Sequence, residues 1–148
     1  PERLRGLPEY DAEKCIGCDA CMQNCPANAI TIVDEEGVRK ITLSYGRCVF
    51  CGRCEEVCPE NAVKLTKNFE LAATSKERMI IENVLPLLKC RRCARPFVPT
   101  PQLRNLSRRF TELGLPMDSV KKLEGGLLLC DKCRTRTAGE LVESIHLA

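Results

Sequence analysis

Two runs of cysteine constrain this chain more than any other feature of its 148 residues. Each run has the form Cys-x-x-Cys-x-x-Cys-x-x-x-Cys-Pro. The first begins at Cys15 and the second at Cys48, an offset of 33 residues. With two residues between neighbouring thiolates, three sulfurs of one short loop can bind the same compact metal group. The runs therefore predict a fold that is organised around metal.

The spacing is that of a bacterial-type pair of [4Fe–4S] clusters, in which the fourth cysteine of each run binds the other cluster. Structural zinc in these eight positions is disfavoured, because zinc sites pair Cys-x-x-Cys knuckles and do not use triads. We therefore expect two [4Fe–4S] clusters with crossed ligation. The expected ligands are Cys15, Cys18, Cys21 and Cys58 for cluster one, and Cys48, Cys51, Cys54 and Cys25 for cluster two.

The composition agrees with folding that depends on metal. The chain has no Trp and only 4% aromatic residues, so neither half can bury a large apolar core. Bonds between metal and protein ligands can supply the missing folding free energy. All 12 cysteines fall into metal-type spacings. None is left over for a disulfide, which indicates a reducing compartment.

The residues between and after the runs predict short strands. The stretches after each Cys-Pro, at 30–33 and 63–65, are rich in β-branched residues. An acidic turn at 34–37 leads to residues 38–45, where apolar and polar side chains alternate as in a half-buried strand. We expect an α+β fold whose first part, residues 1–72, is a pseudo-twofold βαββαβ ferredoxin domain with two clusters.

Residues 73–148 are expected to form a connecting helix and a small, helical, zinc-ribbon-like unit. A capping-box pattern at Thr74 predicts a helix that continues to about Leu85. The other expected elements are a helix over 101–113, a short helix near 118–123, a strand over 127–129 and a last helix capped by Thr137.

The second part of the chain carries two Cys-x-x-Cys knuckles, the pattern of a tetrahedral four-thiolate site. We expect structural Zn²⁺ there, while a mononuclear iron, a third cluster and no metal remain alternatives. Rubredoxin-type iron sites usually have glycine directly after each knuckle, whereas Ala94 and Arg134 follow here. The expected ligands are Cys90, Cys93, Cys130 and Cys133.

The charge is unevenly distributed, with a formal net charge of −3 over residues 1–88 and +6 over residues 89–148. A basic metal ribbon raises the possibility of nucleic-acid binding. Its only aromatic residues are Phe97 and Phe110, so the platforms on which single strands stack are missing. No nucleophile–base pair, phosphate loop or dinucleotide fingerprint is visible. We therefore expect no catalytic site in the chain itself.

The sequence does not predict a membrane helix. No apolar stretch approaches the roughly 20 residues that a membrane helix needs, and no signal peptide is visible. The chain begins at Pro1 without a methionine, which is consistent with a missing N-terminal piece. We expect any membrane association to come through partner subunits.

Several stretches resemble a known family. Arg5-Gly6, the Cys-Ile-Gly-Cys of the first run, and the second run through Pro59 are similar to the two-cluster ferredoxin subunit of respiratory complex I. The segment at 68–72 and the first knuckle with Pro96-Phe97 more closely resemble the ferredoxin-like subunit of formate hydrogenlyase and of energy-converting, membrane-bound [NiFe] hydrogenases. The similarity covers about residues 5–97, and only the second knuckle is shared beyond them.

The resemblance implies a non-catalytic electron-transfer subunit that is peripheral on the cytoplasmic face of the cell membrane. It would relay electrons from soluble ferredoxin or a formate dehydrogenase arm to hydrogenase-like small and large subunits of an ion-translocating complex. The alternatives are a subunit of a complex I-like or related membrane oxidoreductase with another acceptor, and a free soluble ferredoxin. A freely diffusing ferredoxin has no need of the appended C-terminal unit.

Overall fold

The computed structural model describes residues 2, 4–72, 75, 79–114 and 125–146, with side chains of the last helix up to residue 138. The chain divides into two compact units, Pro1–Leu85 and Pro86–Ala148. The domain boundary expected between residues 72 and 73 stays a prediction, since residues 73–74 lie outside the described part. Within the described residues, no helix has the length and apolar character that crossing a membrane requires.

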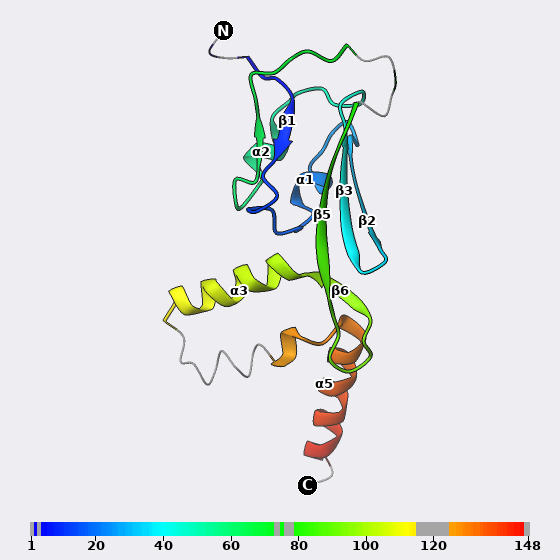
Figure 1. The fold of residues 1–148 in the computed structure, drawn as a ribbon. Helices are drawn as coiled ribbons and strands as arrows, with labels where there is room; N and C mark the ends of the chain where they lie inside the picture. The colour runs from blue at the N-terminus through cyan, green and yellow to red at the C-terminus, as the bar shows by residue number, and fades with distance from the viewer. Residues whose placement is uncertain (1, 3, 73–74, 76–78, 115–124, 147–148) are drawn as a thin grey trace. The chain divides into compact units, whose positions relative to one another are not determined.

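The first unit is a small mixed α/β structure (Figure 1). β1 pairs antiparallel with β4, and β2 pairs antiparallel with β3 over its whole length, with Ile30 opposite Leu43. The strands expected from the β-branched stretches and from the alternating segment are therefore confirmed. The first six elements are β1 (Pro8–Tyr10), α1 (Ala20–Gln23), β2 (Ile30–Glu35), β3 (Val38–Ser44), α2 (Arg53–Glu56) and β4 (Val63–Leu65).

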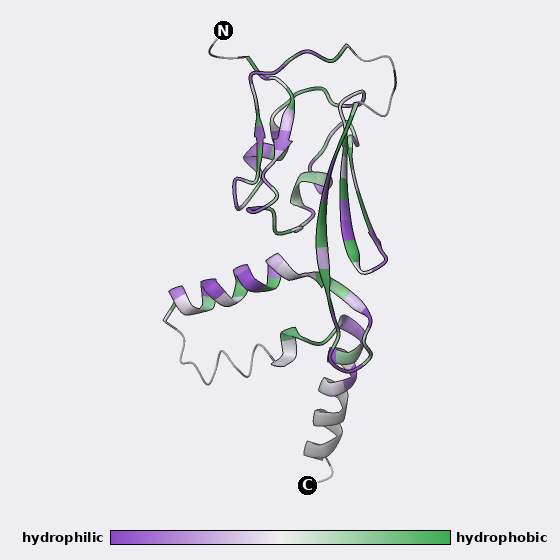
Figure 2. Ribbon diagram, viewed as in Figure 1, coloured by the Kyte–Doolittle hydropathy of each residue, from purple (hydrophilic) through white to green (hydrophobic). Residues whose placement is uncertain are grey.

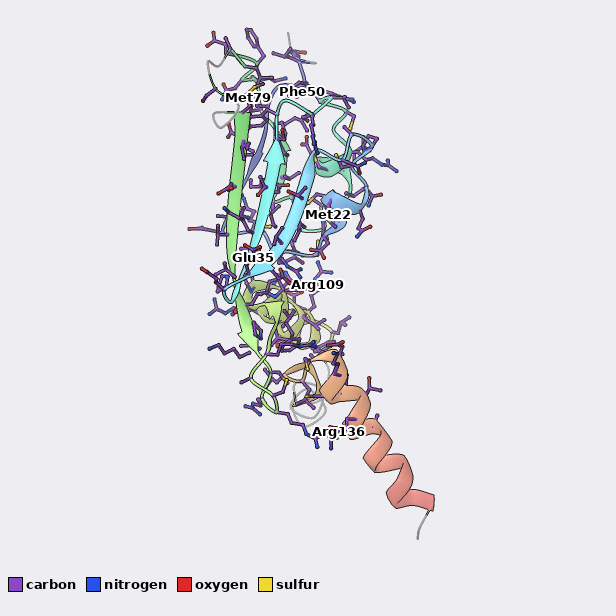
Figure 3. The ribbon with its side chains drawn as sticks, turned by 90° about the vertical axis from the view of Figure 1, so that its right-hand side faces the viewer. Met22, Glu35, Phe50, Met79, Arg109 and Arg136 are labelled. Atoms are coloured by element: carbon purple, nitrogen blue, oxygen red, sulfur yellow. The ribbon has the colours of Figure 1, made fainter. Side chains whose placement is uncertain are left out.

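The connecting helix expected through Leu85 is wrong over the described residues, where the chain forms β5 (Ile80–Lys89). β5 follows β3 in the strand order β2-β3-β5-β6, and Tyr45 N donates to Met79 O at 2.8 Å just before β5 begins. Figure 3 shows β2, β3 and β5 side by side in one layer.

The burial pattern of β5 explains the error. Its buried positions are Asn83, Leu85 and Leu87, which alternate as strand residues do. The apolar residues of this segment also fit a helical face, so the pattern alone was ambiguous. Three β-branched residues, a proline at position 86 and the available edge of β3 favour the extended chain.

The apolar core of the first unit is continuous with the cysteine loops. The partly buried Cys21, Cys25, Cys54 and Cys58 pack against this core, and so does Met22 of α1 (Figure 3). The sheet thus forms one wall of the region that holds the cysteines. The fully buried members of the core are Cys15, Ile30, Ile41, Leu43, Ala62 and Leu85.

The second unit contains β6 (Pro96–Pro99), α3 (Thr100–Glu112) and α5 (Asp131–His146). The end of β5 pairs antiparallel with β6, with Leu88 opposite Val98. α3 has a proline in its first turn and ends before Gly114, whose φ of 68° suits the end of a helix. This confirms the helix expected over 101–113. Figure 2 shows hydrophobic residues along one side of α3 and hydrophilic residues along the other.

Two expectations for the second unit are wrong. Residues 125–127 are helical and are followed by a turn in which Leu129 N donates to Gly126 O at 3.2 Å, so the strand over 127–129 does not form. The last helix begins at Asp131 and not at Thr137, whose hydroxyl donates to Cys133 O at 3.0 Å inside the helix. Asp131 suits a first turn because its carboxylate is stabilised by the helix dipole. The short helix expected near 118–123 lies outside the described residues.

Candidate metal centres

The eight cysteines of the two runs line two cavities in the first unit. Each receives three cysteines from one run and the last cysteine from the other run. Their bonds to metal stay a prediction. Cys15, Cys18, Cys21 and Cys58 line the first cavity, and Cys25, Cys48, Cys51 and Cys54 line the second.

One helical turn accounts for the exchange of the last cysteine. α1 contains Cys21, which lines the first cavity, and Cys25, which lines the second, follows two residues after the helix ends. α2 contains Cys54, which lines the second cavity, and Cys58, which lines the first, follows two residues after that helix ends. The short helix turns the chain after the third cysteine, so that the fourth faces the neighbouring cavity. α1 thus contributes Ala20 and Cys21 to the first cavity, and α2 contributes Arg53 and Cys54 to the second.

Backbone N–H groups donate to the exchanged sulfurs. Ala29 N lies 3.3 Å from Cys25 Sγ, and Ala62 N lies 3.2 Å from Cys58 Sγ. Each donor follows an asparagine in the left-handed region, with φ of 46° at Asn28 and 51° at Asn61. Asparagine tolerates that conformation better than most residues. These donors stabilise negative charge on sulfur, as the thiolates of an iron–sulfur cluster require.

The chemistry of both cavities fits an iron–sulfur cube. Apart from sulfur, their walls are largely apolar, with Ile41 and Val63 in the first and Ile30 and Leu43 in the second. Burial raises the pKa of the Cys15 and Cys21 thiols, and it raises the pKa of Cys54 to about 11. Without metal, these three buried thiols therefore resist ionisation. Iron supplies the positive charge that four thiolates need.

Tyr10 is a neighbour of the first cavity that the sequence did not single out. Its hydroxyl donates to Cys21 Sγ at 3.7 Å. Burial, and then the neighbouring Cys21, raises the pKa of the phenol well above its usual range, so the hydroxyl keeps its proton. The available signal was an aromatic residue five positions before the first cysteine of a run.

Arg39 fixes the loop of the first run. Its Nη1 donates to Gly17 O at 2.7 Å and to Asp19 Oδ1 at 2.9 Å. Its Nε and Nη2 donate to the two carboxylate oxygens of Asp34 at 2.7 and 2.8 Å. The side chain is only 13% exposed. No pattern in the sequence identifies this residue, because its partners come from two separate segments, the loop of Gly17 and Asp19 and the strand residue Asp34.

Arg5 holds the loop of the second run. Its Nη1 donates to Cys51 O at 2.8 Å. The loop itself contains Phe50 (Figure 3), whose backbone N–H donates to Cys48 Sγ at 3.5 Å. Phe50 has a φ of 51°, an unfavourable value for a bulky residue. Arg5 belongs to the Arg5-Gly6 pair on which part of the family resemblance rests, although sequence reasoning gave it no role.

The second unit brings its four cysteines together at the end of β5 and the start of α5. All four sulfurs lie within 4.8 Å of one another. Zinc–sulfur bonds of about 2.3 Å place the sulfurs of a tetrahedral site roughly 3.8 Å apart, so the group fits a four-thiolate ion. Cys90 and Cys130 are buried, and Cys93 is exposed. The remaining member of the group is Cys133.

Hydrogen bonds prepare this group for a cation. Cys130 N donates to Cys90 Sγ at 3.3 Å, and this donor lowers the pKa of Cys90 to about 6. Burial and the neighbouring cysteines raise the pKa of Cys133 to about 12. The thiols therefore do not all ionise on their own, and a divalent cation would relieve their mutual repulsion.

Side chains and a strained turn join the two knuckles. Ala94 closes the first knuckle with a φ of 58°, and its N–H donates to Cys90 O at 2.9 Å. The guanidinium of Arg95 contacts the carboxylate of Asp131. Arg92 Nη1 donates to Thr137 Oγ1 at 3.2 Å. These contacts hold the knuckles together from outside the sulfur group.

The fold and the cysteine-lined cavities define an iron–sulfur protein. Residues 14–62 match the model of the 4Fe–4S dicluster domain, which supports two [4Fe–4S] clusters in the first unit. The four-cysteine group of the second unit lies outside the matched residues.

The chain is homologous to subunits of two kinds of oxidoreductase. It is 46% identical over 98 residues to formate hydrogenlyase subunit 6 of Escherichia coli K12, which covers 65% of this chain and 54% of that protein. It is 40% identical over 91 residues to NAD(P)H-quinone oxidoreductase subunit I of Synechococcus sp. WH7803, which covers 56% of this chain and 41% of that protein. The chain thus spans about half the length of these relatives.

One solved structure has a similar chain. It is the membrane-bound sulfane sulfur reductase, an archaeal respiratory membrane complex. The match has a TM-score of 0.42 and 36% sequence identity, and it covers 52% of this chain and 42% of the other.

Proposed function

We propose that this chain is an electron-transfer subunit that relays electrons through two [4Fe–4S] clusters within a membrane-associated oxidoreductase complex. The observation that carries the proposal is the pair of adjoining cavities, each lined by four cysteines with the last cysteine exchanged. Each bound cluster accepts and releases one electron at a time. The chain's own part is to hold two such groups next to each other and to shield them from water.

The assignment of ligands and the pseudo-twofold βαββαβ domain belong to the same proposal. Corresponding residues of the two halves make corresponding contacts, as the N–H bonds of Ala29 and Ala62 to the exchanged sulfurs illustrate. The order of β1 to β4 with α1 and α2 is consistent with two related halves. We assign residues 1–72 to this domain and residues 73–148 to the appended unit.

The four-cysteine group of the second unit is proposed to hold Zn²⁺ in a structural role. The sulfurs of both Cys-x-x-Cys pairs lie together in this group, and the distances between them suit a tetrahedrally coordinated ion. Zn²⁺ has no redox chemistry, so the site would stabilise the unit without joining the electron path. A mononuclear iron in the same position is the alternative. Metal analysis distinguishes it from zinc.

The partners are proposed from the relatives. Formate hydrogenlyase subunit 6 and NAD(P)H-quinone oxidoreductase subunit I are both named as subunits of larger enzymes. We infer that this chain binds hydrogenase-like small and large subunits on the cytoplasmic face of the cell membrane. Soluble ferredoxin or a formate dehydrogenase arm would donate the electrons. The chain itself would contribute no catalytic site.

Isolation from native membranes tests the proposal. A tagged copy of the chain, expressed at its natural level, should sediment with the membrane fraction and co-purify with hydrogenase-like subunits. The purified assembly should show two [4Fe–4S] signals that a low-potential donor reduces. Recovery of the chain alone from the soluble fraction, with both clusters present, would favour a free ferredoxin instead.

A further inference from the structure

Tyr10 places a side-chain hydrogen-bond donor in the wall of the first cavity. It lines this cavity together with Cys21, and its hydroxyl donates to Cys21 Sγ at 3.7 Å. The side chain is partly buried and packs against the apolar core, so the fold fixes its position. Cys21 is one of the expected ligands of cluster one. The hydroxyl therefore belongs to the immediate surroundings of that cluster.

The strand pairing identifies the residue that corresponds to Tyr10 at the second cavity. Tyr10 lies opposite Val63 at the start of β4. Leu43 lies opposite Ile30 at the start of β2. Val63 and Ile30 hold the same position, five residues after the last cysteine of their runs. Leu43 therefore takes the place of Tyr10, and it lines the second cavity as Tyr10 lines the first. A leucine side chain has no donor.

The charged side chains of the two linings differ as well. The first cavity is lined by the carboxylates of Asp19 and Glu60, and Asp19 pairs with Arg39 at 2.9 Å. Among the described residues that line the second cavity, Arg53 is the only charged or polar side chain other than cysteine. Carboxylates disfavour the negative charge that reduction adds to a cluster. A fixed donor to Cys21 acts in the opposite direction.

We propose that the Tyr10 hydroxyl raises the reduction potential of cluster one and has no such effect on cluster two. Reduction places additional negative charge on the cluster and its cysteine sulfurs. A hydroxyl that donates to Cys21 Sγ stabilises this charge, so it favours the reduced form of cluster one over the oxidised form. The inference rests on the proposed function only in requiring that both clusters bind.

The test is a redox titration of the anaerobically purified full chain, followed by low-temperature electron spin resonance. Tyr10→Phe removes the hydroxyl and keeps the ring, so the packing of β1 changes little. We expect the ratio of reduced to oxidised cluster one, at a fixed solution potential, to fall about threefold. For a one-electron couple this corresponds to a midpoint that is about 28 mV lower. Cluster two should keep its wild-type midpoint.

Tyr45→Phe is the matched control. Tyr45 is the only other tyrosine in the 148 residues, and its hydroxyl donates to Pro8 O, a backbone atom of β1, at 3.0 Å. This variant also loses one hydroxyl and one hydrogen bond to β1 but keeps the bond to Cys21. Its cluster-one midpoint should equal that of the wild type. An unchanged cluster-one midpoint in Tyr10→Phe, equal shifts of both clusters, or the same shift in Tyr45→Phe would overturn the inference.

Fluorotyrosine gives a test in the opposite direction, which also decides the question if Tyr10→Phe does not retain cluster one. In the Tyr45→Phe chain, growth on 3-fluorotyrosine labels Tyr10 alone. Fluorine makes the phenol a stronger donor at nearly the same size, so the cluster-one midpoint should rise above that of the unlabelled variant. An unchanged or lower midpoint would contradict the inference. Absence of two cluster signals in the wild-type protein would contradict the proposed function itself, which distinguishes the two failures.

Discussion

Cys25 ends the first run but lines the cavity of the second run, and Cys58 ends the second run but lines the cavity of the first. Both sulfurs accept an N–H from an alanine four residues later, at 3.3 and 3.2 Å. This reciprocal arrangement ties the two halves of the domain to each other. Loss of one cysteine should therefore damage the cluster of the opposite run.

We predict that Cys25→Ser mainly removes the spin-resonance signal of cluster two, whereas Cys58→Ser mainly removes that of cluster one. A serine hydroxyl is a poorer iron ligand than a thiolate, so the affected cube loses its fourth strong bond. The signals can be assigned by comparison with variants of Cys18 and Cys51, which lie within their own runs. If Cys25→Ser instead eliminates the same signal as Cys18→Ser, the crossed assignment is wrong.

Gly6 is predicted to tolerate no side chain. A Cβ at this position would lie 2.1 Å from Asn68 O and 2.7 Å from Thr66 O, both backbone atoms of the segment beside it. Gly6 N also donates to Thr66 O at 2.9 Å. Gly6→Ala must therefore separate the two segments, with an expected loss of about 2 kcal/mol or more.

The temperature at which the iron–sulfur absorbance disappears measures this loss. It should fall by about 10 °C in Gly6→Ala. Gly46→Ala is a matched control, because its Cβ would meet only the Met79 side chain at 3.7 Å or more and the Ser44 side chain at 3.9 Å. Equal stability of both variants would show that the close approach at Gly6 does not limit the fold.

Replacement of Arg39 by lysine is predicted to weaken cluster one selectively. Lysine keeps the charge but cannot bind Asp34 through two nitrogens while it also reaches Gly17 O and Asp19. The lost bonds correspond to about 1–3 kcal/mol. Under an iron chelator, the cluster-one signal should decay roughly tenfold faster than in the wild type.

Lys40→Ala serves as the control for Arg39→Lys, because Lys40 forms an exposed pair with Glu82 at 3.0 Å and such pairs contribute little. The decay of cluster two should be the same in all three proteins. Faster decay of both clusters in Arg39→Lys would mean that Arg39 supports the whole domain and not one loop.

Metal analysis of the anaerobically purified protein is predicted to give about eight irons and about one zinc per chain. Cys133→Ser should remove the zinc and leave the eight irons, since this cysteine belongs only to the second-unit group. Proteolysis should then cut the second unit faster, because a structural metal contributes its binding free energy to folding. About nine irons with no zinc would establish a mononuclear iron site.

The sequence alone identified the cysteine groups because the information is carried by spacing. Three thiols at intervals of three residues leave few ways to bind a cluster, and two such runs predict an exchange of the fourth ligand. The matched 4Fe–4S dicluster domain over residues 14–62 agrees with two clusters. The short strands after each Cys-Pro and the helix α3 could also be predicted from local sequence, because their turn and cap residues lie next to them in the chain.

Tertiary structure decided the elements whose partners are remote. The segment that begins at Ile80 could have been a helix by its apolar spacing, and pairing with β3 made it a strand. Because this segment is a strand, Asn83 is buried in the core. The apolar face of a helix over the same residues would not have included Asn83. Arg39 similarly contacts the loop of the first run at Gly17 and Asp19, which are 22 and 20 residues away in sequence. Metal ligands follow local spacing, whereas strand pairing and the contacts of buried polar groups depend on which distant segments the fold brings together.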